Sequence, residues 1–462
     1  MELLVKAFFN SRIALADLDA GKVEIMPMPE NMASRGMGGI GTASLLHDHY
    51  RESDPLVLGT GPLTGSFAPA SSLLTATFSS GSGRLVHVPF MKHAGPRMKF
   101  AGIDYLVVIG RAPQPVILDL LDGNARISPA DSLEGTLSQR KSAIESRPGP
   151  CPDSILLTGN AAETALKGAV LSCGLWGSMD KVALGSFAAA KNIRAFTFKA
   201  TKGIAFPENG LERGAALMKT LHRENRVRRT AVLSLMAGSD AASRLIGRHY
   251  KKSHACHHCP LACVSYLEYK PPGLGMKRLR TPAQGLFVMD HEGFAALAAV
   301  RPHDAHHLMR HCIEMGFDPL CAARETDPGL STEEAVDRIT ELCTQNFLET
   351  VSSSRGSQDA SPVPHRLHRL FGGGIPKIQP AGTEDGFDSW QRRVSLSMIL
   401  GVCPVGMLYY HQLRADDLLA FLSADEGALA DLREKARELC DSLTAEPSEG
   451  AKHTECSARG DR

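Results

Sequence analysis

The stretch His254-Ala-Cys-His-His-Cys-Pro-Leu-Ala-Cys263 brings three cysteines, Cys256, Cys259 and Cys263, close together in the chain. Thiolates are soft, charged ligands that suit iron-sulfur clusters and zinc, and both kinds of centre take four ligands. The fourth ligand must therefore come from elsewhere in the sequence. The stretch predicts a metal centre, and the fourth ligand decides its function.

Zinc is the alternative to a cluster, because His254, His257 and His258 lie beside the cysteines and imidazole binds zinc well. The usual zinc pattern pairs two short Cys/His hooks across a loop, and the second hook is missing here. The spacing therefore favours an iron-sulfur cluster over zinc. Three unligated buried thiols are the remaining interpretation.

Length and composition are those of a large enzyme-like protein. The chain has 462 residues, of which 43% are hydrophobic, and this suffices for two or three domains with their own cores. Its 51 basic and 50 acidic residues nearly cancel, so charge gives no reason to expect binding to nucleic acid or to a membrane surface. The expected partner is a small molecule or another protein.

The sequence also bears on the compartment. The beginning, Met-Glu-Leu-Leu-Val-Lys, lacks the features of a secretory signal, and no run of about eighteen apolar residues occurs. The eleven cysteines are scattered without even pairing, which fits reduced thiols and a metal site better than a disulfide framework. We therefore expect a soluble cytoplasmic protein.

The first half of the chain has the pattern of strands and turns. Apolar runs flank short turns at 19–21 and 122–124, which predicts two β-hairpins. The predicted strands are 12–18, 22–28, 116–121, 125–128, 154–158 and 193–198.

Two glycine-rich segments interrupt this pattern, Arg35-Gly-Met-Gly-Gly-Ile-Gly41 and Gly59-Thr-Gly-Pro-Leu-Thr-Gly65. Glycine permits positive φ and lets backbone N–H groups approach an anion closely. A phosphate-binding loop and a plain tight turn explain such segments about equally well. The first segment is not a Rossmann fingerprint, because no clear strand precedes it and the glycine spacing differs.

The second half changes to helical periodicity. Ser331 and Glu334 form a capping box before an apolar stripe, and 416–440 repeats a helical pattern. The polar, broken segment 352–364 between them has the composition of a linker.

These patterns predict an α+β protein. A β-rich, two-sheet domain at 1–202 would be followed by a mainly α-helical, cysteine-bearing region at 203–444. The polar tail at 445–462 is expected to be disordered.

Four histidines lie close together further along the chain: His303, His306, His307 and His311. Pairs spaced four apart share one helical face and could bind a second metal. No Glu lies between them as in zinc proteases, so a partly exposed polar helix face is the favoured interpretation.

The order of these features resembles the aldehyde ferredoxin oxidoreductase family, and the resemblance covers most of the chain. It rests on motifs that are weak singly and strong in this order: 35–46, 59–69, 95–104, 184–195 and the cysteine stretch with its Cys-Pro-Leu-Ala-Cys ending.

This resemblance implies a β domain that serves as the base for a tungsten or molybdenum bis-pyranopterin, with helical domains closing over it. It also implies a [4Fe-4S] cluster, whose fourth ligand in the family lies in a late Gly-apolar-Cys motif. That motif here is Gly401-Val-Cys403, so the implied cluster ligands are Cys256, Cys259, Cys263 and Cys403. The implied cofactor-binding residues are Arg35, Gly36, Gly38, Gly39, Gly61, Gly65, Lys181, Gly185 and Asp318.

The implied activity is oxidation of a small aldehyde to a carboxylic acid, with electrons passed through the cluster to ferredoxin or another small electron carrier. The catalytic acid-base residue is unassigned, because no pairing of acidic groups is visible in the sequence. The resemblance also allows a homodimer. The alternative is a degenerate relative that retains only the cluster, for electron transfer or structure.

The sequence departs from the family pattern where the pterin should bind. Leu73 stands where the family has an arginine that touches the pterin, and 89–93 replaces an Asn-Ser-Gly-Gly element. Lys181 replaces another arginine, which keeps the charge and loses the bidentate fork. Val182-Ala183 follow where the family has two glycines.

Two further family motifs are altered. The segments 313–318 and 398–403 both lack the leading aspartate of motifs that hold the two pterins. The chain is also shorter than typical family members, mainly between 348 and 388, where relatives carry part of the substrate cavity.

Overall fold

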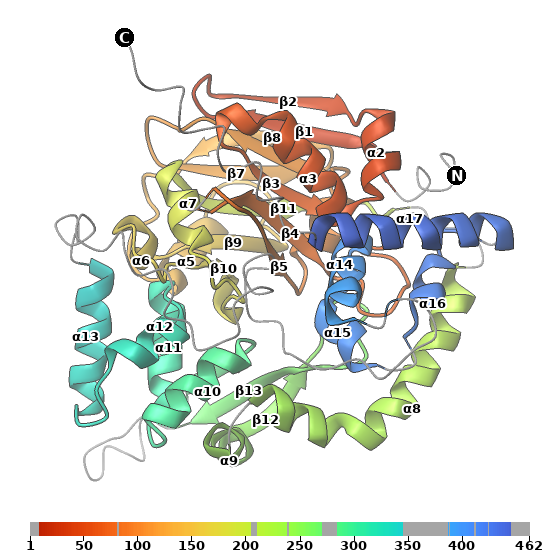
Figure 1. The fold of residues 1–462 in the computed structure, drawn as a ribbon. Helices are drawn as coiled ribbons and strands as arrows, with labels where there is room; N and C mark the ends of the chain where they lie inside the picture. The colour runs from red at the N-terminus through yellow and green to blue at the C-terminus, as the bar shows by residue number, and fades with distance from the viewer. Residues whose placement is uncertain are drawn as a thin grey trace, which may run out of the picture.

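The computed structural model describes residues 9–80, 83–204, 210–237, 240–269, 284–344, 387, 389–410, 413–423 and 425–444. Within these ranges a β-rich part with two large sheets precedes a mainly helical part, which confirms the predicted fold class (Figure 1). The predicted linker at 352–364 and the predicted tail at 445–462 lie outside the described residues.

The first sheet has six strands in the order β2-β1-β6-β3-β4-β5. The predicted hairpin at its edge is confirmed, since Arg12 pairs with Pro27 and Asp17 with Lys22 in antiparallel register. The strands are β1 (Arg12–Asp17), β2 (Lys22–Pro27), β3 (Leu56–Thr60), β4 (Leu74–Ser79), β5 (Leu85–Phe90) and β6 (Tyr105–Ile109).

The second sheet has five strands in the order β10-β9-β11-β7-β8. The second predicted hairpin, β7 with β8, is confirmed, and so are the predicted strands that became β9 and β11. The strands are β7 (Val116–Leu121), β8 (Asn124–Pro129), β9 (Ser154–Thr158), β10 (Leu171–Cys173) and β11 (Ile193–Lys199).

The two sheets share one core and are covered on their outer faces. Successive residues of a strand point to opposite faces, so Leu106 packs into the core shared by the sheets while Tyr105 packs beneath the helices that cover the first sheet. On the second sheet, Phe196 faces the shared core and Ala195 faces the outer core that includes Leu137. Both faces of these strands are buried, which explains their almost continuous apolar sequence.

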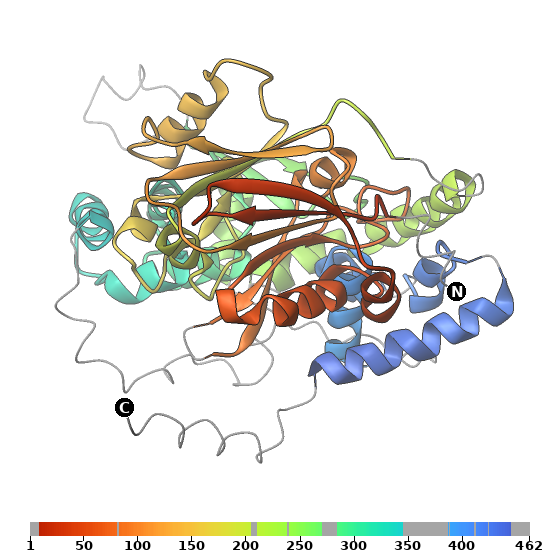
Figure 2. The same ribbon diagram turned by 90° about the horizontal axis from the view of Figure 1, so that it is seen from above.

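The helices gather mainly in the second half. In Figures 1 and 2 α13 and α17 lie on opposite sides of the molecule. The α-helices are α2 (Glu30–Gly36), α3 (Gly39–His49), α4 (Ala94–Phe100), α5 (Leu137–Glu145), α6 (Asn160–Glu163), α7 (Leu184–Ala190), α8 (Gly210–Ala237), α9 (Asp240–His249), α10 (His291–Val300), α11 (Ala305–Met315), α12 (Pro319–Glu325), α13 (Thr332–Thr344), α14 (Trp390–Leu400), α15 (Pro404–Tyr409), α16 (Ala415–Leu419) and α17 (Glu426–Thr444).

The capping box predicted before α13 is present. The backbone N–H of Glu334 donates to the Ser331 hydroxyl at 3.2 Å, and the Ser331 N–H donates to the Glu334 carboxylate at 2.7 Å. The single helix predicted at 416–440 is wrong, because two helices, α16 and α17, occupy this region. Asp425 begins the second one by accepting the N–H of Ala428 at 2.8 Å.

A three-stranded sheet in the second half was not predicted. It consists of β12 (Tyr250–His254), β13 (Val264–Tyr269) and β14 (Gln284–Val288), all antiparallel. The first three of the five residues of β12 are exposed. Its sequence, Tyr-Lys-Lys-Ser-His, does not alternate between apolar and polar residues, which is the pattern that predicts a strand. This sheet frames the cysteine stretch, which connects β12 to β13.

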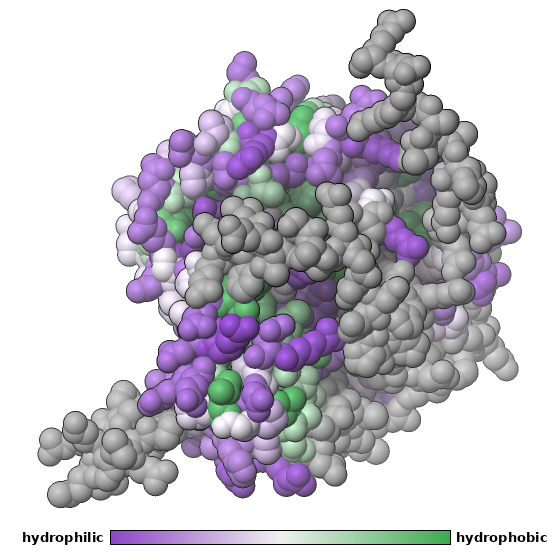
Figure 3. Space-filling model, turned by 60° about the vertical axis from the view of Figure 1, so that its left-hand side comes forward, coloured by the Kyte–Doolittle hydropathy of each residue, from purple (hydrophilic) through white to green (hydrophobic). Residues whose placement is uncertain are grey.

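One face of the molecule is largely hydrophilic where the structure describes it (Figure 3). Figure 3 shows hydrophilic residues over much of one face, with apolar residues in smaller patches between them. Leu211 and Tyr250 are the large hydrophobic residues that the described part of the chain exposes. Among the helices of these ranges, none combines the length and apolar character needed to cross a membrane.

Candidate metal centre

The cysteine stretch forms a tight loop that starts where β12 ends at His254 and finishes where β13 begins at Val264. His258 and Ala262 hold left-handed backbone conformations, with φ of 49° and 46°. Each of these two residues changes the direction of the backbone sharply within the short loop. The loop thereby brings the three cysteine side chains to one side of the core.

Cys403 comes from a different part of the chain. Helix α14 ends at Leu400 and is capped by Gly401, whose φ of 83° is the left-handed conformation that glycine adopts without steric cost. Cys403 then takes the cap position of α15, and Pro404 fills the first turn of that helix. The side chain of Cys403 is 5% exposed.

Ala70 joins these two segments through its backbone. Its N–H donates to the carbonyl of His258 at 2.8 Å, and its carbonyl accepts the N–H of Cys403 at 2.8 Å. Ala70 itself has a φ of 59°, so its peptide groups are turned into a conformation that is uncommon outside glycine. The loop that contains Ala70 therefore fixes the cysteine stretch and Cys403 against each other.

The four predicted ligands lie together in one core. Cys256, Cys259 and Cys263 are half-buried and pack against the cluster of buried residues that contains Cys403. Burial raises the pKa of Cys263 well above its usual range, and the charges of the other three thiolates raise it further. Such mutual repulsion requires proximity, and a bound cation would relieve it.

The neighbouring histidines do not converge on the cysteines. Each of the three rings packs edge-on against a different aromatic side chain: His254 on Trp176, His257 on Phe100 and His258 on Phe67. Within the described ranges, no three His, Cys, Asp or Glu side chains are arranged to hold one metal ion. In a [4Fe-4S] cluster each thiolate binds a separate iron, so its ligands stand farther apart than those of a single ion.

Lys92 is a functional candidate that the sequence analysis missed. It is 1% exposed, and its Nζ lies 3.6 Å from the centre of the Trp176 ring. Burial lowers the pKa of Lys92, while the thiolates of Cys256 and Cys263 oppose this effect. Lys92 can therefore supply positive charge beside a set of negative thiolates.

Cys173 is a fifth thiol near this group. It lies at the end of β10, is 2% exposed and is close enough to Cys256 for the two charges to interact. Burial raises the pKa of Cys173 to about 12. Burial and the charges of Cys259 and Cys256 raise the pKa of Cys403, and the charge of Cys403 in turn raises the pKa of Cys263 beyond the effect of burial. Cys403 is therefore the better fourth ligand of the two.

The glycine-rich segments contact protein where a phosphate was expected. The N–H groups of Gly38, Gly61 and Gly65 donate to the Thr42 hydroxyl, the Thr64 hydroxyl and the Ser71 carbonyl, at 3.1, 3.0 and 2.7 Å. The N–H of Gly185 likewise faces the Asp180 carboxylate at 3.4 Å. Donors that already have protein partners are not free to bind a phosphate.

These glycines allow close contact between two backbones instead. A Cβ on Gly39 would collide with the carbonyls of Met398 and Ile399, and one on Gly61 would collide with Leu400 and Gly401. The N–H of Leu63 donates to the Leu400 carbonyl at 2.9 Å across the same contact. The glycine loops thus hold the end of α14, from which the chain continues to Cys403.

Lys99 forms hydrogen bonds with the second glycine-rich segment. It is fully buried, and its Nζ donates to the carbonyls of Gly61 and Pro62, both at 2.7 Å. Burial lowers the pKa of Lys99 to about 7, with the charge of Asp104 acting in the opposite sense. The amine thus donates to two buried carbonyls of this segment, and the Gly61 carbonyl also accepts the N–H of Thr64 at 3.1 Å.

Replacing Gly61 by Ala is expected to lower both stability and metal content. The new methyl group meets rigid backbone, and overpacking of this kind costs about 1–3 kcal/mol. Denaturant unfolding and iron analysis of the purified variant measure the two effects. Gly210→Ala is the control, because a Cβ at Gly210 meets no atom of the described residues within 4 Å. Equal behaviour of the two variants would contradict the proposed contact between loop and helix.

Lys181 and Asp318 are together, but they bind each other. The Lys181 ammonium contacts Asp290 at 2.6 Å and also contacts Asp318, and all three side chains are at most 9% exposed. Burial alone would lower the pKa of Lys181, but the two carboxylates raise it. Asp290 and Asp318 also begin α10 and α12, where they accept the N–H groups of Gly293 and Leu320. The triad thus ties the segment before α7 to the starts of two helices.

The predicted cofactor residues therefore occupy different environments. Arg35 is exposed at the end of α2, and Gly185 packs against the backbone of Val170. Gly36, the last residue of α2, packs against Thr42 of α3. Leu73, at the position of the family arginine, is fully buried. The predicted pterin-binding residues therefore do not form a site that fits a bis-pyranopterin, whereas the four cysteines fit a thiolate-bound cluster.

Comparison with known proteins finds similarity to one family of oxidoreductases. Residues 13–200 match the family model of the aldehyde ferredoxin oxidoreductase N-terminal domain. The tungsten-containing aldehyde ferredoxin oxidoreductase of Pyrococcus abyssi is 26% identical over 209 residues, which are 43% of this chain and 34% of the relative. The enzyme of the same name from Thermococcus kodakarensis is 23% identical over 290 residues, which are 54% of this chain and 48% of the relative. The matched regions thus span about a third to a half of the length of these relatives.

A comparison with solved structures finds a fold similarity that covers most of the chain. A solved structure, the active site complex BamBC of benzoyl coenzyme A reductase with 1,5-dienoyl-CoA, superposes with a TM-score of 0.68. The match covers 95% of this chain and 89% of that chain at 14% identity. At this identity the likeness is one of fold alone.

Proposed function

We propose that the chain is a divergent, shortened member of the aldehyde ferredoxin oxidoreductase family, and that it is an oxidoreductase that binds one [4Fe-4S] cluster and serves in one-electron transfer. The proposed ligands are Cys256, Cys259, Cys263 and Cys403. The observation that carries the proposal is the shared contact with Ala70, which brings the cysteine stretch and Cys403 to one place.

The surroundings of the four thiols support the proposal. The core around them consists mainly of aliphatic and aromatic side chains, among them Met289, Leu408 and Tyr410, which exclude water. Low polarity and a buried cation such as Lys92 both influence the energy of a reduced centre. When bound, a [4Fe-4S] cluster accepts and releases one electron at a time.

Aromatic side chains lead from this core toward the surface. The ring centroids of Trp176 and Phe287 are 3.9 Å apart, and the ring centroids of Phe287 and Tyr266 are 4.9 Å apart. Tyr266 lines a surface cavity of about 310 Å³ together with Lys252 and Arg310. We propose that ferredoxin or another small carrier exchanges electrons at this surface, in the cytoplasm; the charged residues that line the cavity are Lys252, Arg310 and Glu314.

Oxidation of a small aldehyde at a tungsten or molybdenum bis-pyranopterin is the second candidate function. The family relationship favours it, since the relatives are tungsten-containing aldehyde ferredoxin oxidoreductases by name. The engaged N–H groups of the glycine loops and the pairing of Lys181 with Asp318 weigh against it. A homodimer, as the family resemblance allows, is compatible with either function.

Metal and cofactor analysis of the chain purified without oxygen tests both functions. We expect about four irons and four sulfides per chain, with no stoichiometric tungsten, molybdenum or pterin. Reduction with dithionite should bleach the visible absorbance and produce a one-electron paramagnetic signal. Stoichiometric tungsten or molybdenum with pterin would establish the second candidate and justify an aldehyde screen. Zinc without iron would overturn both.

A further inference from the structure

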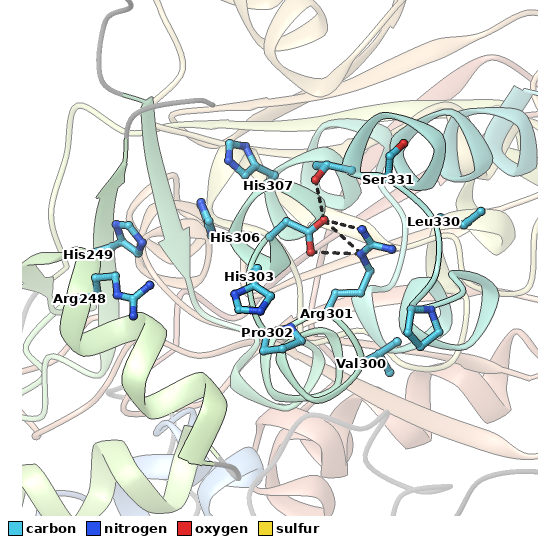
Figure 4. Close-up of a pocket in the computed structure, with 13 residues that line it drawn as sticks. Arg248, His249, Val300, Arg301, Pro302, His303, His306, His307, Leu330 and Ser331 are labelled. Carbon is cyan, nitrogen blue, oxygen red and sulfur yellow. Dashed lines mark hydrogen bonds and ion pairs between the residues drawn. The ribbon is translucent and has the colours of Figure 1, made fainter. Parts of the chain in front are cut away.

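A cavity of about 500 Å³ lies between four helices of the second half, and neither proposed function uses it (Figure 4). The last residues of α9 and α10, the first turn of α11 and the segment before α13 form its walls. Its volume is that of a pocket for a small organic molecule. The lining residues are Arg248, His249, Val300, Arg301, Pro302, His303, Asp304, His306, His307, Pro328, Leu330, Ser331 and Thr332.

The acidic group of this lining is already neutralised. The Arg301 guanidinium donates to the Asp304 carboxylate at 2.7 and 3.1 Å, and the Thr332 hydroxyl donates to it at 2.8 Å. Burial would raise the pKa of Asp304, but these hydrogen bonds outweigh it and the pKa is lowered. Arg248, exposed at the edge of the cavity, forms no ion pair within the described ranges. The net charge that the cavity presents is therefore positive.

His306 supplies a buried hydrogen-bonding group without a partner. Its side chain is 6% exposed, and its Nδ1 has no hydrogen-bond partner within the part of the chain described. In Figure 4 its ring lies between His249 and His307, at centroid distances of 4.9 and 4.2 Å. Leaving such a buried polar atom unpaired costs about 1–3 kcal/mol. A polar ligand atom in the cavity would remove this cost.

The histidines suit an anion better than a metal ion. The His249 and His306 rings are stacked at an interplanar angle of 29°, so their lone pairs do not converge on one point. Burial lowers the pKa of His306 to about 3, which leaves a neutral ring with one N–H to donate. His303 lies at the exposed edge and can provide a further donor.

We propose that this cavity binds the oxyanion group of a small molecule, a phosphate or a carboxylate, between the Arg248 guanidinium and the imidazoles of His303 and His306. A guanidinium fork matches the paired oxygens of both groups. The remaining volume of the cavity accommodates the body of the ligand. This inference does not depend on the metal centre.

Isothermal titration of the intact, metal-loaded chain with inorganic phosphate, and separately with acetate, tests the proposal. At least one of the two anions should bind, and the stronger one identifies the oxyanion class. Arg248→Gln should weaken its binding about tenfold or more, because the charged partner of the anion is lost. His303→Gln, also at an exposed position, should weaken it to a smaller extent.

Arg244→Gln is the matched control. Arg244 is exposed one turn earlier on α9 and does not line the cavity, so its loss removes the same charge from nearly the same surface. Binding in this variant should stay within about twofold of the parent at fixed ionic strength. Equal weakening by both arginine variants, or binding of neither anion, would overturn the proposal. Tight binding of zinc that the His303 variant abolishes would also overturn it, in favour of a metal site.

Discussion

Cys403→Ser is expected to remove the cluster, so that iron falls from about four per chain to less than one. Its backbone N–H donates to the Ala70 carbonyl, and its thiol is close to the three thiols of the cysteine stretch. A serine hydroxyl is a much harder ligand than a thiolate and does not replace it at an iron-sulfur centre. Iron and sulfide analysis, together with visible absorbance after anaerobic reconstitution, measures the loss.

Cys173→Ser is the matched control for this result. Cys173 is equally buried and close to Cys256, but it interacts with fewer of the other thiols than Cys403 does. We expect this variant to retain full iron content. If it loses the cluster while Cys403→Ser keeps it, Cys173 is the fourth ligand and the assignment of Cys403 is wrong. Loss in both variants together with loss of folding, followed by circular dichroism, would reveal a purely structural effect.

Lys181→Met should destabilise the chain by about 3–5 kcal/mol, the largest change in stability expected of any substitution considered. The substitution leaves Asp290 and Asp318 buried side by side with no counter-charge. Denaturant unfolding followed by tryptophan fluorescence measures the difference. The same change at Lys199, whose ion pair with Asp153 is partly exposed, should cost less than about 1 kcal/mol.

A compensated variant separates charge from packing at this triad. Combining Lys181→Met with Asp290→Asn and Asp318→Asn removes the two carboxylates but keeps side chains that begin helices well. This triple variant should recover more than half of the lost stability. If it is as unstable as Lys181→Met, the packing of the lysine stem and not the ion pairs accounts for the loss.

The sequence carried enough information for the elements whose signals are local. The hairpin of β1 and β2 follows from the turn at 19–21 between two apolar runs, and the start of α13 follows from Ser331 and Glu334. β12 escaped prediction because its lysines and serine show no period of two. The break between α16 and α17 escaped because Asp425 suits a helix start as well as an exposed helical position.

Only the local part of the candidate site could be predicted from the sequence, because the rest depends on contacts between residues that are far apart in the chain. The cysteine stretch is a local pattern that the sequence shows directly, whereas the family resemblance, and no spacing rule, indicates Cys403. Asp290, separated by 109 residues from its partner Lys181, gave no signal. Lys92 and Cys173 reach the thiols through the packing of two sheets against the helical part, and periodicity contains no information about that packing.

The bridging position of Ala70 also has a consequence for biosynthesis. The N-terminal part of a chain leaves the ribosome first and can fold before the remainder is made. The peptide groups of Ala70 would then be in place when residues 254–263 emerge, and Cys403 would be the last of the four thiols to arrive. We therefore expect nascent chains that end before residue 403 to capture iron poorly, so that cluster insertion follows translation.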